Sequence, residues 1–217
     1  MNKVIPAFEI SLLEPVFSSS IELSEMGIDS LLDDGVFKNI PIVSLLVGVG
    51  KTAQNIHDRN LLKQTLNFIK TFNDKQISKE KLGKYKEAIN KNPKKAEKEL
   101  ERVLIILNSN VEIKKSQMLA QIYRAYVEEI ISWEQFCELS DVITRLFIID
   151  IDLLYKVYNN EVTDTSQCRS YQADRLISLG LLDSATKSLS IGNTSNSQTV
   201  RYISINKFGD LFCNIIK

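Results

Sequence analysis

The sequence is poor in the residues from which metal centres and disulfide frameworks are built. It contains one histidine, His57, and three scattered cysteines with no CxxC pair. A single histidine excludes a histidine-cluster metal site and leaves one candidate base for a base-assisted nucleophile. An odd number of scattered cysteines does not predict a disulfide framework. We therefore expect a protein of the reducing cytoplasm with no metal and no other cofactor.

Long hydrophobic runs are also missing. The longest apolar stretch, Ile40–Val49, is interrupted by Pro41, Ser44 and Gly48, whereas a membrane-spanning helix needs roughly 20 apolar residues. The N-terminus carries early acids and no long apolar core, so we expect no signal peptide. Ile40–Val49 has two interpretations: a buried core segment, or a surface (residues 40–50) that inserts into a membrane or into a partner's groove.

Neither sign of charge is in excess, because 27 Lys and Arg balance 27 Asp and Glu. A balanced total gives no global field to attract nucleic acid or anionic lipid. The balance hides an asymmetry: residues 1–36 hold seven acids and one lysine, whereas residues 74–115 hold twelve basic and seven acidic side chains. These regions either form solvated helix surfaces or attract each other or a charged partner.

Helical periodicity, in contrast, is abundant. Apolar residues at spacings of four and three predict an amphipathic helix through Leu62, Leu66, Ile69 and Phe72. Asn92-Pro93 predicts an N-cap followed by proline at the first helical position. Ser132 and Gln135 have the spacing of a capping box. They open a pattern that we interpret as one long helix to about Tyr158, apolar on most sides and hence the hub of a bundle.

The composition changes after residue 159. The rest of the chain predicts a helix (about Ser170 to Leu179), a Gly180 stop, strands at Lys187–Ile191 and Thr199–Ile205, and a closing helix from Phe208 to Ile216. This is the element order of a winged-helix module. The expected fold class is mainly α: a helical bundle over residues 1–159, with residues 1–21 as an irregular lead-in, followed by a winged-helix-like α/β module over residues 160–217.

No constellation of residues predicts catalysis. The run from Gly48 to Thr52 lacks the glycine that a P-loop places five residues before its Gly-Lys pair, and Leu45 occupies that position. Asp150 and Asp152 lie two apart on a predicted helix and point to different sides, so they do not form an acid–base pair. We expect them to pair with nearby cations instead, and we assign no catalytic residue.

Two sets of residues are candidate contacts. The first set is the polar run His57, Asp58 and Arg59 at the start of a predicted helix, which either caps, pairs and meets solvent or contacts a phosphate or a partner. The second set is in the C-terminal module, where six basic side chains stand against five acidic ones over residues 160–217. Duplex binding depends on clustered Lys and Arg, so we expect only weak DNA contact. The candidates for nucleic-acid or partner contact in this module are Arg169, Arg175 and Arg201.

Two resemblances to known groups add a biological context. The stretch ELSEMGIDSLLDDGVFKNIPIVSLLVGVGKTAQNIHDRNLLKQTLNFI, with its Asp-Asp-Gly, Ile-Pro-Ile-Val and I-x-D-R pattern, resembles the opening of a group of uncharacterised bacterial helical proteins. The segments ISWEQFCELSDVI and RLISLGLL…YISINKFGDLF fit the same group, and the C-terminal part is also loosely similar to abortive-infection alpha-type proteins. The resemblances imply a bacterial or phage source and a role in antiviral defence, and they bring no catalytic residues.

The sequence therefore predicts a non-enzymatic adaptor or regulatory protein that acts through a protein partner. One alternative is a DNA-binding regulator that uses the C-terminal module. The other is a membrane-acting effector that uses residues 40–50.

Overall fold

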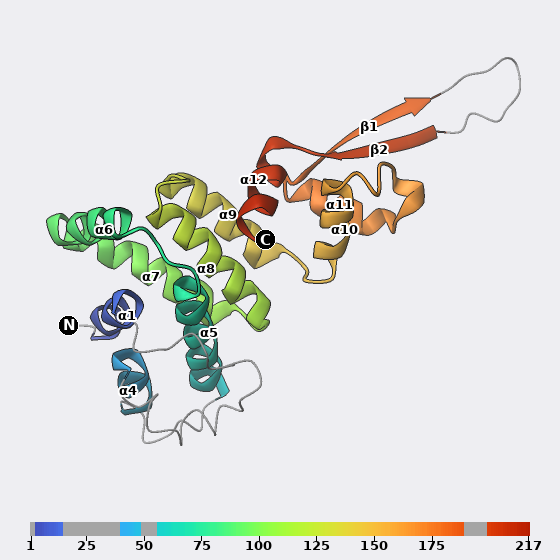
Figure 1. Cartoon of the computed structure of the whole chain (residues 1–217). Coiled ribbons are helices and arrows are strands. Elements are labelled where there is room, and N and C mark those ends of the chain that lie inside the picture. The colour runs from blue at the N-terminus through green and yellow to red at the C-terminus, as the bar shows by residue number, and fades with distance from the viewer. Residues whose placement is uncertain (1–2, 15–39, 49–55, 189–198) are drawn as a thin grey trace, which may run out of the picture. The chain divides into compact units, whose positions relative to one another are not determined.

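The computed structural model describes residues 3–14, 40–48, 56–188 and 199–217 (Figure 1). The chain forms two compact units, Met1–Ser140 and Asp141–Lys217. In the described residues the first unit is helical, and the second combines helices with a two-stranded antiparallel sheet. This confirms the predicted fold class, a helical bundle followed by a small α/β module. The boundary between the units lies after Ser140, ahead of the predicted division at residue 159.

The two units divide the described helices and strands between them. The first contains α1 (Val4–Leu13), α4 (Pro41–Gly48), α5 (Ile56–Asn73), α6 (Lys79–Lys91), α7 (Pro93–Ser109), α8 (Ile113–Val127) and the larger part of α9 (Trp133–Arg145). The second contains the end of α9, α10 (Asp150–Tyr158), the short 3₁₀-helix η1 (Thr165–Gln167), α11 (Ser170–Ser178), β1 (Leu182–Ser188), β2 (Thr199–Ile205) and α12 (Lys207–Ile215).

The prediction of an irregular lead-in over residues 1–21 is wrong for its described part, because α1 is a helix. Pro6 does not prevent it, since the proline lies in the first turn, where backbone N–H groups have no intrahelical partner. Ile5, Phe8 and Leu12 recur at helical spacing and are buried. Their contribution to the core outweighs the proline that suggested an irregular segment.

The apolar segment that begins at Ile40 forms α4, which packs against α1. Ile40, Ile42 and Val43 are at most 1% exposed. The backbone N–H of Ile42 donates to the Ser11 hydroxyl of α1 at 3.1 Å, which satisfies one of the donors at the start of α4. The start of this segment is therefore core, whereas Ser44 is exposed and Leu45 and Leu46 are half-buried. Residues 49 and 50 lie outside the described residues.

Helix α5 lies at the centre of the first unit and contacts α1, α4, α7 and α8. Its predicted stripe is confirmed, because each of the four residues is at most 3% exposed: Leu62, Leu66, Ile69 and Phe72. The predicted cap of α7 is confirmed as well. The Asn92 side chain accepts a hydrogen bond from the backbone N–H of Lys95, and Pro93 takes the first helical position.

The predicted continuous helix from Ser132 to Tyr158 is wrong beyond Arg145. Its capping box is present, with Ser132 and Gln135 exchanging hydrogen bonds of 2.9 and 3.2 Å. The helix then stops after Arg145, and α10 begins at Asp150. The pattern is apolar on all sides because its two halves pack in different cores. Helix α9 contributes Phe136 and Leu139 to the first unit, and α10 contributes Leu153 and Leu154 to the second.

The hairpin of the second unit begins earlier than predicted. β1 starts at Leu182, not at Lys187, and pairs with β2 from Leu182↔Ile205 to Ser188↔Thr199. The second predicted strand, Thr199–Ile205, is confirmed. The first was misplaced because residues 183–186 are exposed, so β1 does not need the apolar alternation of a half-buried strand. The rest of the predicted first strand, residues 189–191, lies outside the described residues.

Three residues join the hairpin to its flanking helices. Gly180 ends α11 with a positive φ of 74°, a conformation that glycine adopts at little cost. Asn206 caps α12 by accepting from the N–H of Gly209, and its side-chain amide donates to the Gly180 carbonyl oxygen. A Cβ at Gly209 would lie 2.0 Å from the backbone oxygen of Leu181. The start of α12 therefore depends on a glycine at this position.

Candidate interaction surface

Helix α11 carries most of the residues of interest in the second unit. Its buried side is formed by Ala173 and Leu176, which anchor it in the core. Tyr171, Asp174 and Arg175 lie on the other side, at the spacing of three and four residues that places side chains together on a helix. One side of α11 is therefore polar and aromatic and points away from the core.

The guanidinium of Arg175 is held by a buried carboxylate. Nε and Nη2 of Arg175 donate to the two oxygens of Asp150 at 2.7 and 2.6 Å, and the Gln172 amide donates to Asp150 at 2.9 Å. Asp150 has no exposed surface, whereas the Arg175 side chain is 32% exposed. The hydrogen bonds from Asp150 raise the pKa of the Arg175 guanidinium. The positive charge of Arg175, which could attract a phosphate, is therefore largely neutralised by Asp150 within the unit.

Two aromatic rings lie against the same guanidinium. The Arg175 Cζ atom is 4.6 Å from the centroid of the Phe147 ring and 5.0 Å from that of the Tyr171 ring. Both distances are within the range of cation–π attraction. Phe147, Ile149 and Tyr171 are 57%, 65% and 50% exposed. We call these three residues and Arg175 the α11 surface.

The other two arginines predicted as contacts lie close to α11 and also have partners. Arg201 of β2 forms an ion pair with Asp174, and Arg169 donates to the Tyr171 hydroxyl at 3.2 Å. The structure thus brings all three predicted arginines to α11 or its neighbours. Each of them interacts with another residue of the second unit.

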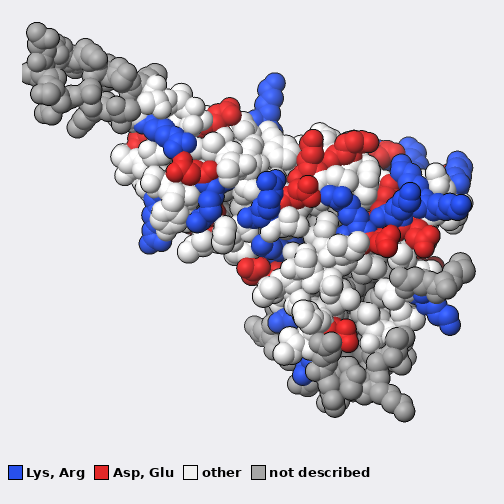
Figure 2. All heavy atoms as spheres, turned by 180° about the vertical axis from the view of Figure 1, so that it is seen from behind, with Lys and Arg blue, Asp and Glu red and all other residues white. Residues whose placement is uncertain are grey.

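The charge of the second unit is balanced, with eight Lys or Arg and eight Asp or Glu. In Figure 2, Lys and Arg atoms are interspersed with Asp and Glu atoms on this unit. A duplex-binding surface needs several cations available to phosphates. The charge arrangement does not favour that use of α11.

Phe147 and Ile149 were missed as surface residues because the sequence pattern placed them inside a buried helix. A signal was present, however. Asp150 and Asp152 lie in the first turn of α10, where acidic side chains interact favourably with the helix dipole. These acids mark a helix start at residue 150 and, with it, a turn that exposes the apolar residues before it. The expected pairing with a nearby cation is confirmed for Asp152, which pairs with Lys156, and is wrong for Asp150, whose partner Arg175 is 25 positions away.

The other predicted cluster, His57, Asp58 and Arg59, lies in the first turn of α5. His57 and Asp58 are exposed and Arg59 is half-buried. Asp58 occupies a favourable position near a helix N-terminus. The other predicted site residues, Arg169, Arg175 and Arg201, belong to the second unit.

The described residues offer little for metal or thiolate chemistry. They contain no group of three His, Cys, Asp or Glu side chains placed to hold a metal ion. Burial raises the pKa of the Cys213 thiol to about 12, so this cysteine is protonated at neutral pH. None of the described helices combines the length and the hydropathy needed to cross a bilayer.

Comparisons with protein-family models, with curated proteins and with solved structures each found no match to this chain. The resemblances drawn from the sequence remain predictions.

Proposed function

We propose that this protein is a non-enzymatic adaptor or regulatory protein that binds another protein through the α11 surface. The observation that carries the proposal is an arginine stacked between two half-exposed aromatic rings, with its charge already satisfied by Asp150. Because Arg175 is already paired with Asp150, removing water from it on binding costs little. The two rings offer apolar area that a partner can bury.

The composition of the α11 surface is that of an interface centre. Aromatic residues and arginine are enriched at the centres of protein–protein interfaces and among residues whose truncation costs most affinity. The pair with Asp150 orients Arg175 before any partner arrives, so little side-chain entropy is lost on binding. Preorganisation of this kind supports a binding role for the surface.

The element order supports the winged-helix interpretation of the second unit. Helix α10 is followed by a bridge between Asp164 and Tyr202, by η1 and α11, and then by the β1–β2 hairpin. This corresponds to helix, short strand, helix, helix and wing, with α11 in the place of the recognition helix. In DNA-binding proteins that helix enters the major groove. Here its arginine is paired internally, which favours a protein partner.

A DNA-binding regulator is the alternative, and a salt titration separates the two. We expect labelled duplex to bind weakly, with a shallow salt slope between about 50 and 200 mM, because few phosphates can be neutralised. Nanomolar binding with a steep slope that is lost in Arg169→Ala/Arg201→Ala would make the protein a DNA-binding regulator and overturn our proposal.

The membrane-effector alternative is less favoured, because Ile40, Ile42 and Val43 are buried and not available to a membrane. A role in antiviral defence rests on the sequence resemblance alone, and we propose it only as the setting in which the partner is found.

Affinity capture with matched variants tests the proposal. We expect the wild-type chain to retain a stoichiometric protein partner that Phe147→Ser/Tyr171→Ser does not retain. The control is Ile105→Ser on α7, which removes a side chain of similar exposure (63%) from the first unit. Loss of the partner in the control, or its retention in the double variant, would contradict a role for the α11 surface.

A further inference from the structure

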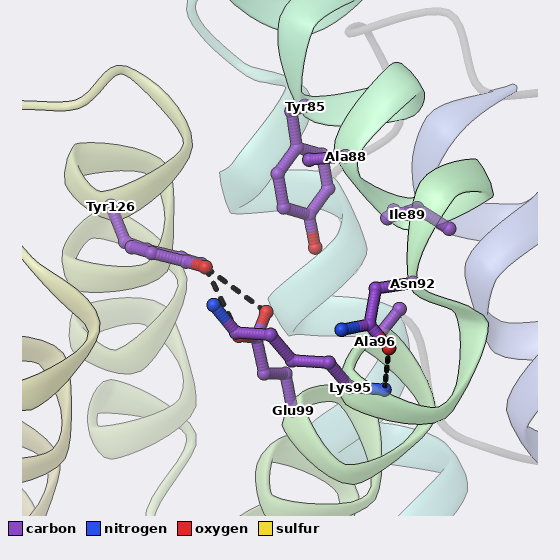
Figure 3. Close-up of a pocket in the computed structure, with 8 residues that line it drawn as sticks. All are labelled: Tyr85, Ala88, Ile89, Asn92, Lys95, Ala96, Glu99 and Tyr126. Atoms are coloured by element: carbon purple, nitrogen blue, oxygen red, sulfur yellow. Dashed lines mark hydrogen bonds and ion pairs between the residues drawn. The ribbon is translucent and has the colours of Figure 1, made fainter.

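A small pocket lies between α6, α7 and α8 in the first unit (Figure 3). Its volume of about 40 Å³ is more than a single water molecule needs and leaves room for a small polar group. The polar and aromatic groups in its wall come from Tyr85, Asn92, Lys95, Glu99 and Tyr126. None of these residues belongs to the α11 surface, so the pocket is independent of the function proposed above.

The acidic group of the pocket is Glu99, whose side chain is 6% exposed. The Tyr126 hydroxyl donates to both carboxylate oxygens, at 3.0 and 3.2 Å (Figure 3). Burial raises the pKa of the Glu99 carboxyl above its ordinary value, although Tyr126 and Lys95 act in the opposite direction. A carboxylate in this position gains from any additional cation.

The cation that the structure places beside Glu99 is a loosely held one. Lys95 Nζ lies 3.7 Å from a carboxylate oxygen, and the Lys95 side chain is 62% exposed. Because the lysine is exposed and its nitrogen is 3.7 Å away, water screens part of the attraction, and fixing the lysine costs side-chain entropy. The position of Lys95 Nζ thus shows that an ammonium group fits beside Glu99. Lys95 itself is held only weakly there.

Two aromatic rings complete the environment. Tyr85 and Tyr126 lie edge to face, with ring centroids 6.2 Å apart. The Tyr85 hydroxyl is already paired with the hydroxyl of buried Tyr123, so Tyr85 offers the pocket its ring. Ring faces attract ammonium groups, and a carboxylate next to them strengthens that preference. Anions are disfavoured by Glu99.

We propose that this pocket binds the ammonium head group of a primary amine, which takes the place of Lys95 on Glu99. The ammonium donates hydrogen bonds to the carboxylate and packs against the tyrosine rings. A quaternary ammonium group carries no N–H and cannot donate these hydrogen bonds to the carboxylate. A free small amine and the lysine side chain of a protein both present this head group.

The test is a titration of the ¹⁵N-labelled full chain with methylammonium chloride, followed by two-dimensional NMR. Sodium chloride at equal ionic strength is the blank, and tetramethylammonium chloride is the control that has a cation without N–H donors. We expect saturable shifts of amides around Tyr85, Glu99 and Tyr126 with methylammonium, and none with either control. Equal shifts with tetramethylammonium, or no saturable shift at all, would refute the site.

Variants identify the groups responsible. Glu99→Gln should weaken methylammonium binding at least tenfold, whereas Glu101→Gln, an exposed position on the same helix, should leave it unchanged. Lys95→Met should strengthen binding several-fold, because it removes the competing ammonium. Unaltered binding in a folded Glu99→Gln chain would overturn the proposal.

A second pair of probes identifies the source of the amine. Nα-acetyl-lysine amide and its Nε-acetylated form differ only in the ammonium group. Tighter binding of the first than of methylammonium assigns the pocket to a lysine side chain, and weaker binding assigns it to a free small amine. Equal binding of both lysine probes would show that the ammonium is not recognised, and the proposal would fail.

Discussion

At the scale of single residues, Asp150 links the break in the long helical pattern to the α11 surface. It is fully buried, and its carboxylate accepts hydrogen bonds from Arg175 and Gln172 of α11. A buried carboxylate must be paired, so its position in the first turn of α10 also fixes where α11 lies.

We expect Asp150→Asn to lower the free energy of unfolding by about 2 kcal/mol, because it leaves a partly buried guanidinium without its counter-charge. Chemical denaturation of the full chain measures this. Asp152→Asn is the matched control: it removes an exposed i, i+4 pair with Lys156, and its effect should stay within about 0.5 kcal/mol. Equal effects of the two variants would contradict the importance of the buried pair.

The second prediction at this scale concerns pH. Because burial raises the pKa of Glu99, the folded protein holds a proton at pH values where the unfolded chain has released it. The contribution of this group to stability therefore falls as pH rises from the ordinary pKa of 4.5 through the raised one, and then levels off. Lys95, Tyr85 and Tyr126 lie around the carboxyl, and a glutamine keeps an acceptor for Tyr126.

Glu99→Gln should thus be at least as stable as wild type near pH 7, with a difference that shrinks toward about pH 4. Urea denaturation of both chains across this range gives the comparison. A variant that is less stable than wild type at pH 7 and equally stable at pH 4 would show the opposite sign and refute the assignment.

At the scale of elements, the sequence predicted the features that depend on residues close together in the chain. The stripe of α5, the Asn92 cap of α7 and the capping box of α9 depend on neighbouring residues, and all three are confirmed. The break at residues 146–149 interrupts a continuous apolar pattern, and Asp150 after it pairs with Arg175, 25 positions away in sequence. The start of β1 depends on its pairing with β2. Neither of these is written in local periodicity.

The candidate site was predictable only in part for the same reason. Arg169, Arg175 and Arg201 were selected as candidate contacts, but Arg175 and Arg201 have partners in other elements, which sequence spacing does not reveal. Phe147 and Ile149 have the same residue types as core positions. Only the turn that follows α9 exposes them.

Gly209 gives an element-scale prediction for α12. We expect Gly209→Ala to destabilise the second unit by roughly 2 kcal/mol, since the added methyl group overlaps the Leu181 carbonyl oxygen and forces α12 to move. The control is Gly83→Ala in α6, where an added methyl group meets nothing within 4 Å and raises helix propensity. Thermal unfolding should show a lower Tm for the first variant and an unchanged or higher Tm for the second.

A further element-scale prediction concerns α4. Ile42→Asp should destabilise the first unit by several kcal/mol, because it places an unpaired charge at a position with no exposed surface. Ser44→Asp, at an exposed position of the same helix, is the control and should cost little. Flotation of the folded wild-type chain with lipid vesicles would contradict the core assignment of this segment.

At the scale of the whole molecule, the chain has two units with separate cores, and the two units have surfaces of different composition. The first unit holds several aromatic rings in contact with one another and the small polar pocket beside Glu99. The second holds an exposed aromatic pair around a neutralised arginine. We therefore propose that the second unit binds the partner.

The most direct test of that assignment is site-specific photo-cross-linking in the native host. The chain carries p-benzoylphenylalanine in place of Phe147, with the same substitution at Ile105 as the control position. The account predicts a discrete protein adduct from position 147 that is lost when Asp150→Asn is added, and no such adduct from position 105. A nucleic-acid adduct at position 147, or identical protein adducts from both positions, would contradict it.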